Sequence, residues 1–264
     1  MIDYHIHTRL CNHAGGTMKE YIKCAVGMGM KEICFLDHLT VQKTEKNLSM
    51  SLDQVPYYFQ AVQRLKNQYY GIISIKSGLE IDFNPEHVET FNEISKLYDF
   101  DVIATALHFP KGINIVSHKS DWKKKKFDID AIYDMYYNQL QIMLNYDYFD
   151  LICHLDLVKK FGMKPSISFE KKIDEILVEI KQKNLAVEIN TSGYDHPAGE
   201  AYPSFDIIKK CHTLGISITL GSDAHTPEDV GRHYDKVIPV LLSIGYRKVA
   251  SFNSRKSMPL KIKN

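Results

Sequence analysis

The chain has 264 residues, of which 44% are hydrophobic and 25% are charged, a composition typical of a soluble globular protein with enough apolar material for a core. Its formal net charge of +1 excludes a strong overall field that would recruit nucleic acid or an anionic membrane. No apolar run approaches the roughly 20 residues that a membrane-spanning helix needs, so we expect no integral membrane protein.

Strands and helices are predicted to alternate along the chain. Short apolar runs predict seven strands, over 2–6, 31–36, 72–79, 101–107, 149–153, 185–189 and 216–220. Segments with helical spacing of apolar residues lie between them, over about 18–29, 53–68, 85–97, 129–145, 168–183 and 204–213. The first of these helices opens at Thr17 with Glu20, which resembles a capping box. The tail, 228–264, is expected to form one or two closing helices with a basic end.

This alternation predicts an α/β protein with a parallel sheet and right-handed crossovers. Seven strands in this order can close into a barrel, and a barrel of about 250 residues forms one domain. No linker or change in composition divides the chain, so we predict a single domain over residues 1–264. An open, doubly wound sheet is the alternative, although no glycine-rich phosphate loop follows the first strand.

Potential metal ligands recur at or just after the carboxyl ends of the predicted strands. They are His5, His7, His38, Glu80, His108, His154, Asp223 and His225. In a barrel these strand ends form the face on which active sites assemble. Any one such histidine is more often an ordinary core or loop residue, but the joint placement favours a shared metal cluster. So many imidazoles disfavour an oxygen-rich magnesium site and favour zinc, with iron or manganese as alternatives.

The cysteines are odd in number, scattered along the chain and free of any Cys-x-x-Cys pair; they are Cys11, Cys24, Cys34, Cys153 and Cys211. This usage predicts reduced thiols in a cytoplasmic protein. Cys34 and Cys153 lie in apolar runs and are expected to be buried and inert, whereas Cys11 is close enough to the predicted site for a metal contact. A cleaved signal peptide is not expected, because its removal would take away His5 and His7.

Several short motifs resemble those of a known family. They are His5-Ile6-His7-Thr8, Cys11-Asn12-His13-Ala14, Leu36-Asp37-His38, Gly78-Leu79-Glu80, His108-Phe109, His154-Leu155-Asp156-Leu157 and Gly221-Ser222-Asp223-Ala224-His225. In this order, over nearly the whole chain, they are similar to the motifs of the polymerase and histidinol phosphatase (PHP) family. Residues 154–162 and 188–193 make the chain most similar to the monofunctional histidinol phosphatases of that family.

The resemblance implies a distorted, seven-stranded (β/α)7 TIM-like barrel of the PHP type that holds three divalent metal ions. By that similarity the first ion is held by His5, His7, Glu80 and Asp223, the second by Glu80, His108 and His154, and the third by His13, His38 and His225. His13 lies in a predicted loop and enters the set through the resemblance alone.

The implied chemistry is metal-dependent hydrolysis of a small phosphate monoester, with L-histidinol phosphate as the expected substrate. Water held by metal ions has a lowered pKa, and the ions neutralise charge on the phosphate oxygens. The candidate catalytic residues are Glu80, Asp223 and His225, while the donor of the proton to the leaving alcohol stays open between Asp223 and a nearby histidine. Neither a nucleic acid nor a membrane is expected as a partner, and the oligomeric state stays open.

One segment departs from the relatives that the chain resembles. A basic residue, often arginine, is expected around position 195 or 196 to meet the substrate phosphate, but Asp195 and His196 stand there. An imidazole matches neither the permanent charge nor the two-pronged fit of a guanidinium. Lys160 and His196 are therefore the candidate substrate contacts, each weighed against an ordinary solvated side chain. The run 123–126 is four lysines, interpreted as a solvated loop or an anion-attracting lid.

Two alternative functions stay open from the sequence. One is a phosphoesterase or nuclease of the same family that acts on another phosphate ester. The other is a non-catalytic metal-binding protein that has kept the barrel, which the full set of ligands at the strand ends disfavours, because a structural zinc site closes with four ligands.

Overall fold

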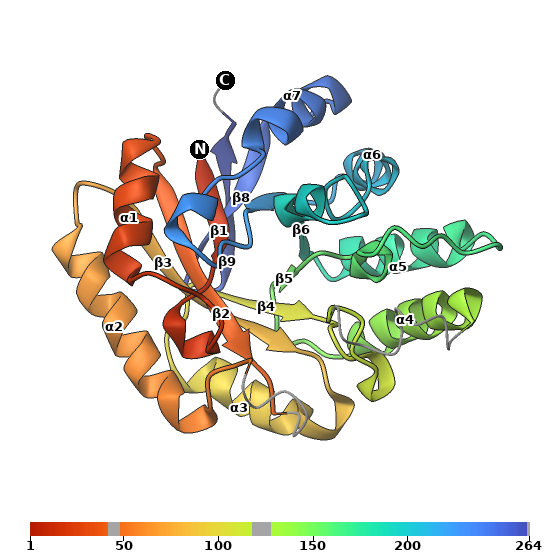
Figure 1. Cartoon of the computed structure of the whole chain (residues 1–264), viewed down its shortest axis with the longest axis horizontal. Coiled ribbons are helices and arrows are strands. Elements are labelled where there is room, and N and C mark those ends of the chain that lie inside the picture. Colours follow the sequence, from red (N-terminus) through yellow and green to blue (C-terminus); the bar gives the residue numbers. More distant parts are fainter. Residues whose placement is uncertain (42–47, 118–127, 263–264) are drawn as a thin grey trace.

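Seven parallel strands, paired in the order of the chain, form the centre of the molecule (Figure 1). They are β1 (Ile2–Ile6), β2 (Glu32–Leu39), β3 (Ser74–Asp82), β4 (Val102–Ala106), β5 (Leu151–Ile152), β6 (Ala186–Asn190) and β7 (Ile218–Gly221). The structure is a computed structural model and describes residues 1–41, 48–117 and 128–262. The sequential strand order confirms the predicted barrel topology over an open, doubly wound sheet.

The two edges of this sheet meet and nearly close the barrel. The backbone N–H of His7 donates to the carbonyl of Ala224 at 3.0 Å, and the N–H of Ala224 donates to the carbonyl of His5 at 3.0 Å. The buried carboxylate of Asp3 adds a second link, since it accepts from the N–H groups of Ser222 at 2.9 Å and Gly231 at 3.0 Å. The end of β1 is thereby fixed against the segment that follows β7.

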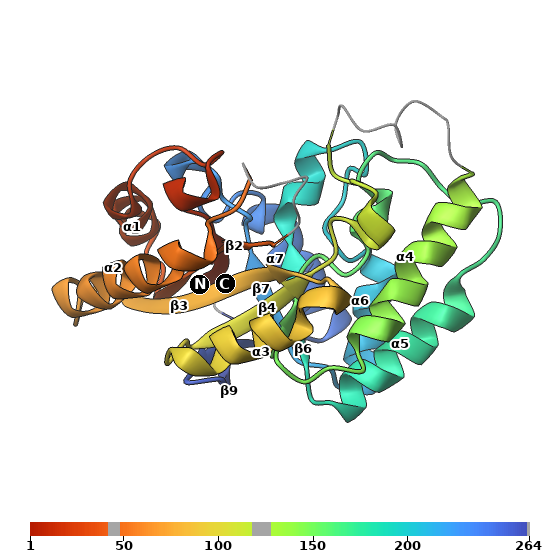
Figure 2. The same ribbon diagram turned by 90° about the horizontal axis from the view of Figure 1, so that it is seen from below.

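Helices surround the strands (Figure 1) and are α1 (Met18–Gly27), α2 (Val55–Gln68), α3 (Val88–Leu97), α4 (Ile129–Met143), α5 (Glu170–Gln182), α6 (Phe205–Leu214) and α7 (Tyr234–Ile244). The predicted capping box opens α1, where the Thr17 N–H donates to the Glu20 carboxylate at 2.6 Å. Figure 2 shows α4 and α5 side by side, across the sheet from α1 and α2. No helix in the described ranges is long and apolar enough to cross a membrane.

The expectation of one or two closing helices in the tail is only partly right. After α7 the chain forms an antiparallel hairpin of β8 (Lys248–Asn253) and β9 (Lys256–Lys261). The middle of β8 is buried, and its turn residues Ser254 and Arg255 both have positive φ, at 46° and 67°. Neither turn residue is the glycine or asparagine that usually signals such a turn, so the sequence lacked the ordinary signal.

The largest differences from the predicted strands are at the carboxyl ends of β2 and β3 and in the length of β5. β2 continues to Leu39 and β3 to Asp82, so His38 and Glu80 lie within the sheet and are paired in register with each other. β5, expected over 149–153, has strand geometry only at Leu151–Ile152. The extended register of β2 and β3 matters because ladder hydrogen bonds hold both candidate ligands in place.

Candidate metal centre

All of the predicted metal ligands come together at the carboxyl end of the barrel. His5 lies in β1 with His7 directly after it, and His38 and Glu80 lie in β2 and β3. His108 follows β4, His154 follows β5, and Asp223 and His225 follow β7. His13 lies in the loop after β1. Neighbouring rings are close, with centroids 4.1 Å apart for His7 and His38 and 4.9 Å apart for His108 and His154.

The carboxylate of Glu80 lies between two groups of imidazoles. Its Oε2 is 2.6 Å from Nδ1 of His38 and 3.3 Å from Nε2 of His5. Its Oε1 is 2.8 Å from Nε2 of His154 and 3.6 Å from Nε2 of His108. A carboxylate that presents one oxygen to each group has the arrangement needed to bridge two cations.

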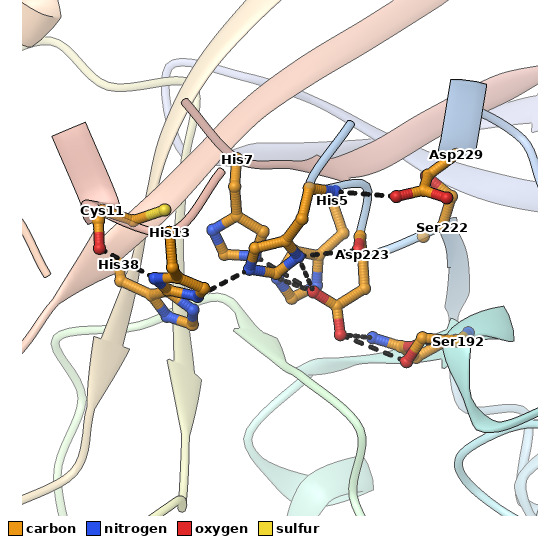
Figure 3. A network of polar contacts seen from close by, with 12 residues as sticks. His5, His7, Cys11, His13, His38, Ser192, Ser222, Asp223 and Asp229 are labelled. Atoms are coloured by element: carbon orange, nitrogen blue, oxygen red, sulfur yellow. Dashed lines mark hydrogen bonds and ion pairs between the residues drawn. The ribbon is translucent and has the colours of Figure 1, made fainter. Parts of the chain in front are cut away.

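Asp223 faces the first group from the loop after β7 (Figure 3). Its Oδ1 is 3.1 Å from Nε2 of His7, and its Oδ2 accepts from the Ser192 hydroxyl at 3.2 Å. The residue has a positive φ of 55°, an uncommon conformation for a side chain other than glycine. Because the backbone conformation turns the carboxylate toward the imidazoles, this loop is built around the placement of Asp223.

His13 and His225 form a pair whose geometry suits a cation. Their Nε2 atoms are 2.8 Å apart, while Nδ1 of His13 is 2.8 Å from the Cys11 carbonyl and Nδ1 of His225 is 3.0 Å from the Asp223 carbonyl. A carbonyl accepts only, so each Nδ1 carries the proton of a neutral ring and each Nε2 presents a lone pair. Two facing lone pairs repel unless a positive charge is shared between them.

Carboxylates behind the ligands fix the orientation of three rings. Glu188 accepts from Nδ1 of His5 at 2.5 Å, and Asp37 is 3.3 Å from Nδ1 of His7. Asp82 is 3.3 Å from Nδ1 of His108 and also accepts from the backbone N–H of that residue at 2.8 Å. Such outer partners are a regular feature of metal-binding histidines. Sequence reasoning missed these three acids, although a carboxylate inside an apolar strand, as at Glu188, is itself a signal.

The protonation states of most groups in the cluster are those of metal ligands. Burial raises the pKa of Glu80, but the imidazoles of His38, His5 and His108 outweigh burial and hold this pKa well below its usual range. Burial and the neighbouring His38 lower the pKa of His7 to about 3. His5 is the exception, because the carboxylates around it outweigh burial and raise its pKa.

Buried atoms without hydrogen bonds give a direct test of whether the cluster fits a metal. Within the described residues, Nε2 of His5 and Oε2 of Glu80 are buried and make no hydrogen bond; they lie 3.3 Å apart, and Oε2 also has an ion-pair contact with Nδ1 of His38 at 2.6 Å. A buried polar atom that is left unpaired costs about 1–3 kcal/mol. Both atoms are good ligands for a transition metal, so the residues present fit divalent cations of the zinc, iron or manganese type.

A cavity of about 370 Å³ opens beside the cluster. Lys160 and His196, the two candidate substrate contacts, both line it, as do Ser192 and Arg232. Burial, then Lys160, lowers the pKa of His196 to about 4, so this imidazole is neutral near pH 7. Another part of the wall is apolar and comprises Leu39, Leu48, Phe109, Val116 and Leu157.

Other sequence-based predictions have mixed outcomes. The Cys11 thiol is buried near His13 and His225, but burial raises its pKa to about 12, and its role as a metal contact stays a prediction. Cys34 and Cys153 are buried free thiols, as predicted. The lysine run 123–126 lies outside the described residues. Arg232, which sequence reasoning did not single out, stands on the cavity wall.

Comparisons with known proteins agree with the geometry. Over 261 residues the chain is 30% identical to a Deinococcus radiodurans protein named "Probable histidinol-phosphatase", covering 98% of this chain and 99% of that protein. It is 26% identical to the "Histidinol-phosphatase" of Lactococcus lactis, covering 97% and 95%. The crystal structure of the Lactococcus lactis histidinol phosphate phosphatase, complexed with zinc, L-histidinol and phosphate, superposes with a TM-score of 0.84 at 25% identity, covering 97% and 98%.

The family profile agrees with both comparisons. Residues 3–192 match the PHP domain, and the full-length relatives extend the similarity to Asp223 and His225. The strand topology, the ligand cluster and these similarities confirm the resemblance found in the sequence motifs: the chain belongs to the PHP family.

Proposed function

We propose that the protein is a metal-dependent phosphatase that hydrolyses L-histidinol phosphate to L-histidinol and phosphate. The observation that carries the proposal is the Glu80 carboxylate between two groups of imidazoles, directly beside a cavity with a cationic wall. Similarity over nearly the whole chain to proteins named histidinol-phosphatase supports the choice of substrate.

Three divalent ions, with zinc favoured, are proposed to occupy the cluster. His5, His7, Glu80 and Asp223 would hold one; Glu80, His108 and His154 the second; His13, His38 and His225 the third. When bound, such ions supply an activated water as nucleophile and neutralise charge on the phosphate. The Lactococcus lactis crystal structure, a complex with zinc, L-histidinol and phosphate, supports the metal and the product chemistry.

Side chains around the cavity are proposed to bind the phosphate, hold the organic part of the substrate and donate the proton to the leaving group. Lys160 and Arg232 provide fixed positive charge for the phosphate dianion, and the neutral His196 can hydrogen-bond to it. The apolar wall, which includes Phe109 and Leu157, would hold the organic part of the substrate and exclude water from it. Asp223, at the edge of the cavity, is the proposed acid that returns a proton to the leaving alcohol, with His225 beside it as the alternative donor.

The active unit is proposed to be the whole chain, residues 1–264. The PHP match ends at residue 192, whereas Asp223 and His225 belong to the ligand cluster and follow β7. A cytoplasmic location is inferred from the five free thiols, which a reducing compartment preserves.

Phosphate release from a panel of phosphomonoesters tests the proposal. The zinc-loaded full chain is expected to favour L-histidinol phosphate, to lose turnover with a chelator and to regain it with added divalent metal. Cleavage of generic esters with L-histidinol phosphate left intact would overturn the substrate assignment. Cleavage of a single-stranded oligonucleotide would favour a nuclease, and absence of all turnover in the metal-loaded protein would favour a non-catalytic metal-binding protein.

A further inference from the structure

Arg232 joins the two loops that flank the cationic side of the cavity. It lies between the loop after β7 and α7, and its side chain is 21% exposed. Its Nε donates to the carbonyl of Ser222 at 2.8 Å, and Nη2 donates to the carbonyl of Asp223 at 2.7 Å. Its Nη1 is 3.2 Å from Oδ2 of Asp195. The same Nη1 is 3.4 Å from Oδ1 of Asp229, so two carboxylates and two carbonyls hold the guanidinium in one orientation while it lines the cavity.

Asp195 stands where a basic residue is expected from the resemblance to histidinol phosphatases. Its two carboxylate oxygens bind two different partners, Oδ2 with Arg232 and Oδ1 with Nε2 of His233 at 2.6 Å. Asp195 therefore cannot replace the expected basic residue directly. It fixes an arginine that comes from a different part of the chain.

The cavity wall that contains Arg232 also contains Lys160 and His196. Burial lowers the pKa of both Lys160 and His196, and the nearby Arg232 charge adds to the lowering in each case. Lys160 and Arg232 are two basic side chains on this wall, and a phosphate monoester carries about −1.5 to −2 charge near neutral pH. The basic side chains on this wall can donate charge-assisted hydrogen bonds to phosphate oxygens.

We propose that Arg232 is the phosphate-recognition arginine of this enzyme and that Asp195 is its positioning residue. The chain has an acid at 195 and supplies the guanidinium from residue 232, through an ion pair between two loops. This inference rests on the proposed function, because it concerns the phosphate group of the same substrate.

The test uses inorganic phosphate as a competitive inhibitor of the zinc-loaded full chain, with a generic phosphomonoester as substrate. Arg232→Gln is expected to weaken phosphate inhibition by about 10-fold to 100-fold, because a charge-assisted pair is lost. Asp195→Asn is expected to weaken it about twofold to fivefold and to raise KM with little change in kcat, because the ion pair is partly exposed. Zinc content is measured for every variant.

A rescue and a matched control separate phosphate recognition from a structural role. Asp195→Arg, added to Arg232→Gln, is expected to restore phosphate inhibition, because it places a guanidinium at the position expected in relatives. Glu228→Gln removes an exposed carboxylate from the same β7–α7 loop and is expected to change nothing. A structural role for Arg232 predicts loss of zinc in Arg232→Gln and no rescue by Asp195→Arg.

Two results would overturn the inference. One is unchanged phosphate inhibition in Arg232→Gln with full zinc content. The other, which applies if Arg232→Gln loses zinc, is unchanged phosphate inhibition in Asp195→Asn. Neither result concerns histidinol phosphate, so the inference can fail while the proposed function stands, and failure of the wild-type protein to cleave histidinol phosphate leaves the phosphate-inhibition test intact.

Discussion

The two ends of the barrel both bury polar side chains, but they satisfy them differently. At the amino end, the Tyr4 hydroxyl donates to Glu32 at 2.5 Å and accepts from the N–H of Phe252 in β8 at 2.7 Å, while the Ser251 hydroxyl donates to Glu32 at 2.6 Å. At the carboxyl end, His5 and Glu80 leave buried atoms without hydrogen bonds. A closed network serves stability, whereas the buried atoms without hydrogen bonds belong to candidate metal ligands at the other end.

The largest effect that would sharpen this contrast is expected from Glu80→Gln. The amide keeps the shape but loses the charge that faces both groups of imidazoles, so bound metal and turnover are expected to fall together. The loss of activity is expected to exceed about 100-fold, the upper range for partners outside the ligand shell. Metal analysis with a phosphate-release assay measures both, and Glu93→Gln on exposed α3 is the matched control. Full metal content with normal turnover would refute the bridging role.

A smaller effect at the same end is expected from Glu188→Gln. This residue touches no substrate, but its carboxylate orients His5 and accepts from the N–H of His154 at 2.9 Å. Zinc affinity is expected to fall about 10-fold to 100-fold, since the ring loses its anionic partner. Titration against a competing chelator gives the affinity. An affinity equal to that of the wild-type protein would show that Glu188 serves packing alone.

A substitution at the amino end is expected to lower stability and to leave metal binding and turnover unchanged. Tyr4→Phe removes a fully buried hydroxyl and leaves Glu32 and the Phe252 N–H short of a partner. The free energy of unfolding is expected to drop by about 1–3 kcal/mol. Zinc content and kcat are expected to stay at wild-type values, because the hydrogen-bond partners of the hydroxyl are Glu32, Ser251 and Phe252 and include no candidate ligand. Urea unfolding measures the stability of the variant, and a turnover assay measures its kcat. If Tyr4→Phe keeps full stability but has a reduced kcat, the amino end does not serve stability alone.

The smallest effect is expected from mild acidification of the metal-free protein. Because the pKa of His7 is lowered from 6.5 to about 3, the unfolded chain binds a proton below pH 6.5 that the folded state excludes. The lowered pKa of Glu80 acts with the same sign at lower pH. The raised pKa of His5 changes stability only above pH 6.5, where its contribution is lost as pH rises.

The free energy of unfolding is therefore expected to fall as pH goes from 6.5 to about 5.5, by at most about 1.4 kcal/mol for each such group. Urea unfolding at several pH values in the presence of chelator measures the slope. A free energy of unfolding that rises over this range would show that the imidazoles are not held neutral by the fold.

Strand order and the set of strand-end histidines could be predicted from the sequence because each depends on a local pattern. Apolar runs alternate with helical segments, and the candidate ligands stand at fixed places relative to those runs. His13 had no such pattern, and only the resemblance to a known family pointed to it. The structure then placed it 2.8 Å from His225, which lies 212 residues further along the chain.

What could not be predicted depends on contacts between segments far apart in the chain. Asp195 was interpreted only as the absence of an expected basic residue, because no local pattern in the sequence shows that Arg232 lies against it. The C-terminal hairpin was missed for a related reason, since the burial of β8 comes from strands of the barrel such as β7, whose Thr219 hydroxyl donates to the Ala250 carbonyl at 2.8 Å. Propensity is a weak guide where packing decides.

The backbone hydrogen bonds between β1 and the segment after β7 have a consequence for folding during synthesis. His5 and His7 leave the ribosome more than 200 residues before Asp223 and His225, the residues proposed to share the metal cluster with them. A nascent polypeptide that lacks this segment can gather only an incomplete coordination shell. If the cluster binds metal as proposed, tight metal binding requires a completed barrel, and a stalled product is expected to bind the metal poorly.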